Sequence, residues 1–258
     1  MYGDTVLPDN FSQDYLLNKQ IKILQPLDGY RASTDAVLLS AAVKEKEKNL
    51  RILDVGSGTG AISLCLAHRL QSLNPQIFGI ELQQQLCELS NQSAKLNGFD
   101  FLTYLNADIS DKKLFDTLSP CSFDIVITNP PYSDHDMPSP NSSKATAHNH
   151  GDLNLTSWIN FCLKMTKPFG QIYMINRVEA LPEICCALQK KAGGIDIIPL
   201  YSKSAQRAKR IIINFQKDSK APCRISEPFI THQADGSYTE KAEKILRQGA
   251  IFADIITI

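Results

Sequence analysis

From about Arg51 onward, the sequence alternates short runs of β-branched residues with longer helix-like stretches. This alternation is typical of a parallel sheet whose strands are joined by crossover helices. It predicts an α/β, Rossmann-like fold with a seven-stranded, mostly parallel sheet and helices on both faces. The expected helices cover residues 61–73, 83–98, 155–170 and 181–194. The expected strands are RILDV, QIFGI, LTYLNAD, FDIVIT, QIYMI, IDIIPL and RIIINF.

The length of 258 residues suits one large α/β domain. We therefore expect a single domain over residues 1–258, with an N-terminal segment at 1–50 and a core at 51–258. A turn-rich strand at 24–33 and a helix at 34–48, with Thr34 as a candidate N-cap, precede the core. The stretch 133–152 is polar and irregular, and loops of that length are usually functional or disordered.

The composition excludes several classes of protein. Hydrophobic residues at 43% and charged residues at 21% provide a core and argue against wholesale disorder. Lys plus Arg and Asp plus Glu both number 27, so a nucleic acid would have to be held by a local basic patch. The seven cysteines include no CxxC pair, which fits reduced thiols in a cytoplasm. Without a basic and apolar leader or an apolar run of about 18 residues, we expect neither export nor a membrane span.

A glycine-rich turn follows the first core strand and opens an apolar helix. It reads Asp54-Val55-Gly56-Ser57-Gly58-Thr59-Gly60. Glycine lets the backbone approach a ligand closely, and a helix N-terminus offers free N–H groups. The spacing is G-x-G-x-G after an acid, whereas the dinucleotide fingerprint is G-x-G-x-x-G. We therefore predict that Asp54, Gly56, Gly58 and Gly60 bind S-adenosylmethionine.

Two further acids follow the next two strands. Glu81 ends the second strand, where a carboxylate can accept hydrogen bonds from both ribose hydroxyls. Asp108 follows the third strand and could accept one from the adenine amine of the cofactor. Each acid alone would be more simply a surface or capping residue, but three acids at successive strand ends favour a cofactor site.

The tetrapeptide Asn129-Pro130-Pro131-Tyr132 follows the fourth strand, at the sheet edge where ligands of such folds collect. A conjugated nitrogen attacks a sulfonium methyl only when hydrogen-bond acceptors draw its lone pair out of conjugation. The Asn129 side-chain oxygen and the Pro130 carbonyl can supply two acceptors, and Tyr132 can stack on a flat substrate. Asn129, Pro130 and Tyr132 are thus the predicted catalytic residues; a merely rigid turn is the alternative.

Other polar clusters are less informative. Histidines at 135, 148 and 150 match no common metal spacing, so no metal is expected. The lone Trp158 is interpreted as a core residue. Basic residues form two clusters in the sequence. Each cluster could bind phosphates or could simply lie on a solvated surface. These residues are Lys203, Arg207, Lys209 and Arg210 before the last strand, and Lys241, Lys244 and Arg247 near the C-terminus.

At this point the chain resembles a known family. Gly29-Tyr30-Arg31, Ser33-Thr34-Asp35-Ala36-Val37-Leu38-Leu39, the glycine turn, NPPY and Asp235-Gly236-Ser237-Tyr238-Thr239 are similar to segments of the tRNA (adenine-N6) methyltransferases that modify the adenine beside the anticodon of a valine tRNA. The resemblance runs from about Gln25 to Arg247. It implies a class I methyltransferase fold with an antiparallel last strand. It also implies that the segment around Tyr30, Arg31, Thr34 and Asp35 closes over the cofactor while an extruded adenine enters the Asn129 pocket.

Three alternatives remain open. An enzyme that methylates a release-factor glutamine also uses NPPY, because an amide nitrogen poses the same lone-pair problem. A guanine-N2 or DNA-adenine methyltransferase is the next enzyme alternative. A catalytically silent RNA-binding module on the same scaffold is the alternative that is not an enzyme.

Overall fold

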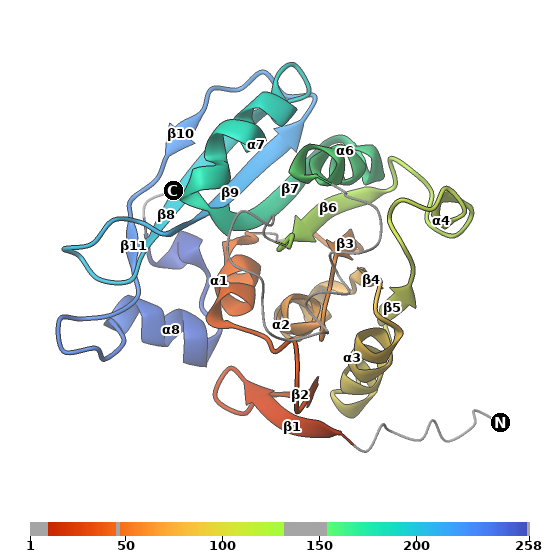
Figure 1. Ribbon diagram of the computed structural model, residues 1–258, viewed down its shortest axis with the longest axis horizontal. Helices are drawn as coiled ribbons and strands as arrows, with labels where there is room; N and C mark the ends of the chain where they lie inside the picture. The colour runs from red at the N-terminus through yellow and green to blue at the C-terminus, as the bar shows by residue number, and fades with distance from the viewer. Residues whose placement is uncertain (1–9, 45–46, 132–153, 257–258) are drawn as a thin grey trace.

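The computed structural model describes residues 10–44, 47–131 and 154–256. In this part of the chain, nine strands form the central sheet (Figure 1). They are β3 (Arg51–Val55), β4 (Gln76–Glu81), β5 (Leu102–Asn106), β6 (Phe123–Thr128), β7 (Thr166–Arg177), β8 (Ala192–Tyr201), β9 (Arg210–Lys217), β10 (Arg224–Ile225) and β11 (Phe229–Ile230).

The strand order is β10-β8-β9-β7-β6-β3-β4-β5, with β11 also paired to β8. Strands β3 to β7 pair in parallel, whereas β9 runs antiparallel to both β7 and β8. The order reverses between β3 and β6, so the carboxyl ends of these two strands flank the point where such sheets bind ligands. The doubly wound fold with an antiparallel last core strand is therefore confirmed.

Helices cover both faces of the sheet (Figure 1). Buried residues of α1, α2, α3 and α8 form one core cluster, and those of α4, α6 and α7 form the other. The α-helices are α1 (Thr34–Ala42), α2 (Ala61–Leu70), α3 (Gln84–Leu96), α4 (Leu114–Thr117), α6 (Leu155–Met165), α7 (Leu181–Leu188) and α8 (Glu240–Gln248). Short 3-10 turns are η1 (Gln71–Leu73), η2 (Val178–Ala180) and η3 (Phe252–Asp254). No described helix is both long and apolar enough to cross a membrane.

All seven predicted strands are present, but the sheet is wider than expected. The two-residue strands β10 and β11 extend it along β8, and their shortness leaves no alternating pattern to read. A separate antiparallel hairpin joins β1 (Phe11–Leu16) and β2 (Ile21–Pro26). The predicted strand 24–33 overlaps β2 only at residues 24–26 and is wrong over 27–33, where the chain has no regular secondary structure.

Three predicted helices are too long. The first ends at Ala42 and not at residue 48. The second ends at Met165, directly before β7, and the third ends at Leu188, leaving three residues before β8 begins. After α6, the Thr166 hydroxyl donates to the Cys162 carbonyl (2.7 Å), while Pro168 cannot donate the N–H that a continuing helix requires. The N-cap of α1 is Ser33 and not Thr34, because the Ser33 hydroxyl accepts from the Asp35 N–H (3.3 Å).

Candidate functional site

The glycine turn folds back from the end of β3 onto the end of β4. The N–H groups of Gly56 and Ser57 both donate to the Ile80 carbonyl at 2.9 Å. The next glycine N–H, of Gly58, donates to the carboxylate of Glu81 at 2.8 Å. These three bonds fix the loop against the sheet edge, and Gly60 then becomes the N-cap of α2.

Three aromatic rings press against the glycines of this loop. Gly56, Gly58 and Gly60 all have positive φ, at 71°, 57° and 81°. A Cβ would lie 2.9 Å from the Trp158 ring at Gly56 and 2.6 Å from the Tyr30 ring at Gly58, and at Gly60 it would collide with the Tyr104 hydroxyl. Both the backbone conformation and the close rings therefore require glycine at these positions.

Unpaired buried oxygens concentrate in the same loop. Asp54 is fully buried and accepts from the Ser63 hydroxyl through Oδ2. Its Oδ1, the Ser57 hydroxyl and the Thr59 hydroxyl have no hydrogen-bond partner among the described residues. Buried polar atoms are normally paired, so a cluster of three marks a place for a polar ligand. Burial raises the pKa of Asp54 to about 7, despite the Ser63 hydrogen bonds.

The Glu81 carboxylate is engaged by backbone N–H groups. One oxygen accepts from Gly58 and the other from the Gln83 N–H (2.8 Å). Burial raises the pKa of this carboxyl, and the backbone hydrogen bonds oppose the rise. The carboxylate thus ties the glycine loop to the start of α3, a structural role that the sequence did not indicate.

Asp108 lies one strand further along the same edge. Its carboxylate accepts from the Ser110 N–H at 2.7 Å and so closes a turn. The preceding Asn106 side chain donates to the carbonyls of Glu81 (3.0 Å) and Leu82 (2.8 Å). The ends of β3, β4 and β5 therefore bring Asp54, Glu81 and Asp108 to one edge, as the sequence predicted.

The Asn129-Pro130 segment is joined to the glycine loop by its neighbours. Thr128, the last residue of β6, donates to the Val55 carbonyl at 2.8 Å. Asn129 is half buried, Pro130 is buried, and no described residue hydrogen-bonds to the Asn129 side chain. Pro131 is described and exposed, whereas Tyr132 and the polar stretch 133–152, with its histidines at 135, 148 and 150, lie outside the described residues. Among the described residues, no cluster of metal ligands occurs.

Trp158 has a role that its interpretation as a core residue missed. It packs against the second core cluster, but its Nε1 also donates to the Thr128 hydroxyl at 2.8 Å. The same ring covers Gly56. One side chain therefore contacts both the glycine loop and the strand that delivers Asn129. Its place at the start of α6, directly after the polar stretch, was the available sequence signal.

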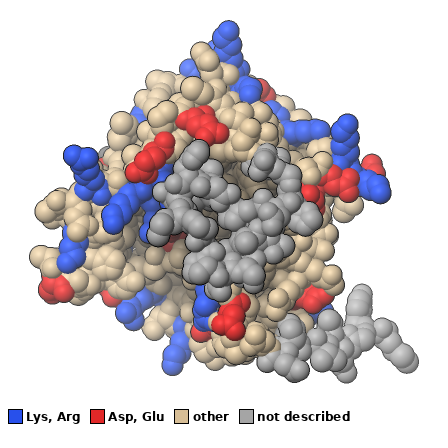
Figure 2. All heavy atoms as spheres, in the orientation of Figure 1, with Lys and Arg blue, Asp and Glu red and all other residues tan. Residues whose placement is uncertain are grey.

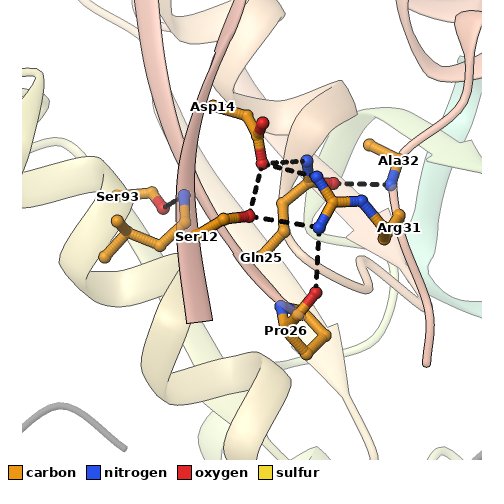
Figure 3. Close-up of polar contacts among 8 residues, drawn as sticks. Ser12, Asp14, Gln25, Pro26, Arg31, Ala32 and Ser93 are labelled. Atoms are coloured by element: carbon orange, nitrogen blue, oxygen red, sulfur yellow. Dashed lines mark hydrogen bonds and ion pairs between the residues drawn. The ribbon is translucent and has the colours of Figure 1, made fainter. Parts of the chain in front are cut away.

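Arg31 points into the hairpin (Figure 3). It donates to the Asp14 carboxylate (2.7 Å), the Ser12 hydroxyl and the Pro26 carbonyl (both 3.1 Å). Burial alone would raise the pKa of Asp14, but hydrogen bonds from Ser12 and Gln25, together with Arg31, lower it. This network holds the turn that carries Tyr30 onto Gly58, while Thr34 is exposed at the first turn of α1.

A protein-family model matches most of the chain. A family model described as "Methyltransferase domain" matches residues 46–247, well over half of the chain. The chain belongs to this family. It is a methyltransferase with a class I fold, and S-adenosylmethionine is its methyl donor.

The individual relatives have low sequence identity to this chain. The methyltransferase is 26% identical to a tRNA1(Val) (adenine(37)-N6)-methyltransferase of Actinobacillus pleuropneumoniae, over 89% of this chain and 94% of the relative. It is 28% identical to a protein of the same name from a Flavobacteriaceae bacterium, over 86% and 92%. A solved structure of a predicted O-methyltransferase from Agrobacterium tumefaciens shares the fold, with a TM-score of 0.70 and 24% identity over 84% of this chain and 97% of that one.

Replacing Trp158 by Phe removes the indole N–H and part of the ring over Gly56. We expect the free energy of unfolding to fall by about 1 to 3 kcal/mol, because the buried Thr128 hydroxyl loses a partner. Hydrogen exchange at the Gly56 and Ser57 amides should accelerate. Phe161→Leu, on the same helix, is the control: it should reduce stability in urea unfolding without selectively accelerating these amides. Equal exchange rates in both variants would show that Trp158 only fills space.

Asp54→Asn should change how stability depends on pH. The folded pKa, about 7, lies above the unfolded value near 4, so wild-type stability falls as pH rises between these values. The variant lacks this slope. Its stability relative to wild type should therefore improve by up to about 4 kcal/mol from pH 4 to 7 and then level off. Urea unfolding across this range, with Asp108→Asn as a half-exposed reference, measures the effect. A difference independent of pH would contradict it.

Proposed function

We propose that this methyltransferase transfers the methyl group of S-adenosylmethionine to the exocyclic N6 of an adenine in tRNA. The observation that carries the proposal is the hydrogen bond from Thr128 to Val55. This bond holds the Asn129-Pro130 segment beside the glycine loop, and in our proposal the donor and acceptor sites therefore share one edge of the sheet. A transfer reaction needs such an arrangement, because its rate depends on holding the two reacting atoms in line.

The residues around the loop suit the cofactor. The unpaired oxygens of Asp54, Ser57 and Thr59 offer hydrogen-bonding capacity for its polar groups. We also propose Gly56, Gly58 and Gly60 as backbone contacts of the cofactor, while the rings of Trp158, Tyr30 and Tyr104 fill the space that a Cβ would take at these glycines. We propose Glu81 for the ribose and Asp108 for the adenine amine of the cofactor, each with lone pairs remaining beside its backbone contacts.

The N-terminal segment 1–50 completes the site in this proposal. Tyr30 packs on Gly58 and is about one-third exposed, at 36%, so its ring can cover a bound cofactor. Arg31 would act through Tyr30, because its guanidinium anchors the turn to the hairpin. Thr34 stays a predicted contact at the first turn of α1.

At the acceptor end of the proposed site, Asn129 and Pro130 bind the adenine amine and make its nitrogen more reactive. The Asn129 Oδ1 and the Pro130 carbonyl accept the two N–H bonds of the adenine amine, which draws its lone pair toward the methyl carbon. Bound S-adenosylmethionine would supply an activated methyl group as a sulfonium and would leave as the neutral thioether, while the methylated amine would lose one proton to solvent. We propose that Tyr132 stacks on the base.

The choice of adenine in tRNA rests on the relatives. Proteins named tRNA1(Val) (adenine(37)-N6)-methyltransferase match most of this chain, and the chain covers 94% of one of them. An adenine in an anticodon loop is already single-stranded, so its extrusion into the Asn129 pocket costs little.

Incubation with labelled S-adenosylmethionine and total tRNA, followed by mass spectrometry of the digested nucleosides, tests the proposal. Labelled N6-methyladenosine is the expected product. Label in protein glutamine would instead support the amide alternative, and labelled N2-methylguanosine the guanine alternative. Absence of any cofactor binding by calorimetry would support a silent RNA-binding module.

Asn129→Ala should reduce the transfer rate by at least about a hundredfold, because one of the two acceptors for the amine is lost. Cofactor affinity should stay close to that of wild type. Pro131→Ala, which removes an exposed ring and neither acceptor, should lose far less activity. Single-turnover methylation and calorimetry measure the two quantities. A parallel loss of transfer and cofactor binding would mean that Asn129 only maintains the fold of the site.

A further inference from the structure

The two basic clusters of the sequence differ once their partners are known. In α8, each cation is paired with an acid: Lys241 with Glu227 (2.9 Å), Lys244 with Glu240 (2.7 Å) and Arg247 with Glu243 (2.6 Å). Such pairs leave little net positive charge on the helix surface. This cluster is therefore a poor candidate for gripping phosphate.

The other cluster lies in the loop between β8 and β9, residues 202–209, which we call the basic loop. No Asp or Glu occurs between Asp196 and Asp218 in the sequence. Arg207 and Lys209 are exposed, and neither side chain has a hydrogen-bond or ion-pair partner in the described part of the chain. Unlike the cations of α8, these two charges are available to an incoming anion.

The flanking cations of the basic loop are already engaged. Lys203 donates to the Ala234 carbonyl at 2.9 Å and lies near Asp235, whose pKa its charge helps to lower after the Ser237 hydrogen bonds. Arg210, the first residue of β9, forms an ion pair with the buried Asp35. These contacts fix both ends of the basic loop, so that Arg207 and Lys209 project from an anchored position.

The sheet topology places the basic loop on the active-site edge. Because β9 runs antiparallel, its start lies beside the carboxyl ends of β7 and β8. Only β7 separates β9 from β6, and the register places Thr128, the end of β6, across from Ile213 of β9. Arg210 lies three residues beyond Ile213 toward the basic loop, so it is about 14 Å from the end of β6. Figure 2 shows Lys and Arg side chains on the side of the molecule where Figure 1 places β8 and β11.

We propose that the basic loop is the tRNA-docking surface, with Arg207 and Lys209 binding backbone phosphates next to the nucleotide at Asn129. This proposal rests on the proposed function. Positive side chains on phosphates set the register of a nucleic acid without reading its bases. The side chains of Ser204 and Gln206 in the same loop can add neutral donors. The balanced charge of the whole chain agrees with such a local grip.

The test compares two double variants of the full chain that each remove two positive charges. Arg207→Ala with Lys209→Ala changes the basic loop, and Lys244→Ala with Arg247→Ala is the matched control in α8. Filter binding of unmodified tRNA is measured from low to high salt. We expect the basic-loop variant to bind about tenfold more weakly or worse at low salt. The slope of log affinity against log salt should also become shallower by about 1 to 2, since fewer counterions are released.

The control variant should retain wild-type tRNA affinity, and both variants should retain wild-type cofactor affinity. Equal tRNA binding by the two variants would overturn the proposal, as would a greater loss in the α8 variant. The outcome is independent of the catalytic test. If wild type methylates tRNA but the basic-loop variant binds it normally, only the docking surface fails. If wild type yields no N6-methyladenosine yet binds tRNA through Arg207 and Lys209, only the proposed function fails.

Discussion

The hydrogen bonds that converge on the ends of β3 and β6 hold the site together. Thr128 donates to Val55 and accepts from Trp158, so that two strands and one helix meet at a single buried hydroxyl. The glycine loop begins one residue after Val55, and the acceptor segment begins one residue after Thr128. A shift at this hydroxyl would therefore move the glycine loop and the Asn129-Pro130 segment together.

Much of the fold follows from periodicity. All seven core strands were visible because they are apolar runs of five or more residues between helix-like stretches. The helix ends were harder to predict. The residues after Met165 and Leu188 are compatible with a helix in sequence, but in the structure they lead into β7 and β8. The two-residue strands β10 and β11 and the hairpin strand β1 form through pairing with other strands, and no local sequence pattern predicts that pairing.

The candidate site likewise contains features that the sequence predicts and features that it does not. Glycines and acids at strand ends could be found from spacing, since their chemistry depends on where the chain turns. The aromatic rings on the glycines could not, because Tyr30 and Trp158 reach them from distant parts of the sequence. Likewise, the pairing state of a lysine or arginine is a property of its neighbours in space. Two basic clusters that look alike in sequence therefore differ in available charge.

The bond between Trp158 and Thr128 has an evolutionary consequence. It joins two residues that are thirty positions apart and that flank the acceptor segment and the polar stretch after it. The two ends of the chain segment between Thr128 and Trp158 are thus held together by this hydrogen bond. Loop-closure entropy grows only slowly with length, so insertions or deletions between these anchors cost little stability. A change of length between the anchors therefore leaves Thr128 and Trp158 in place, and with them the contact of the Trp158 ring with Gly56.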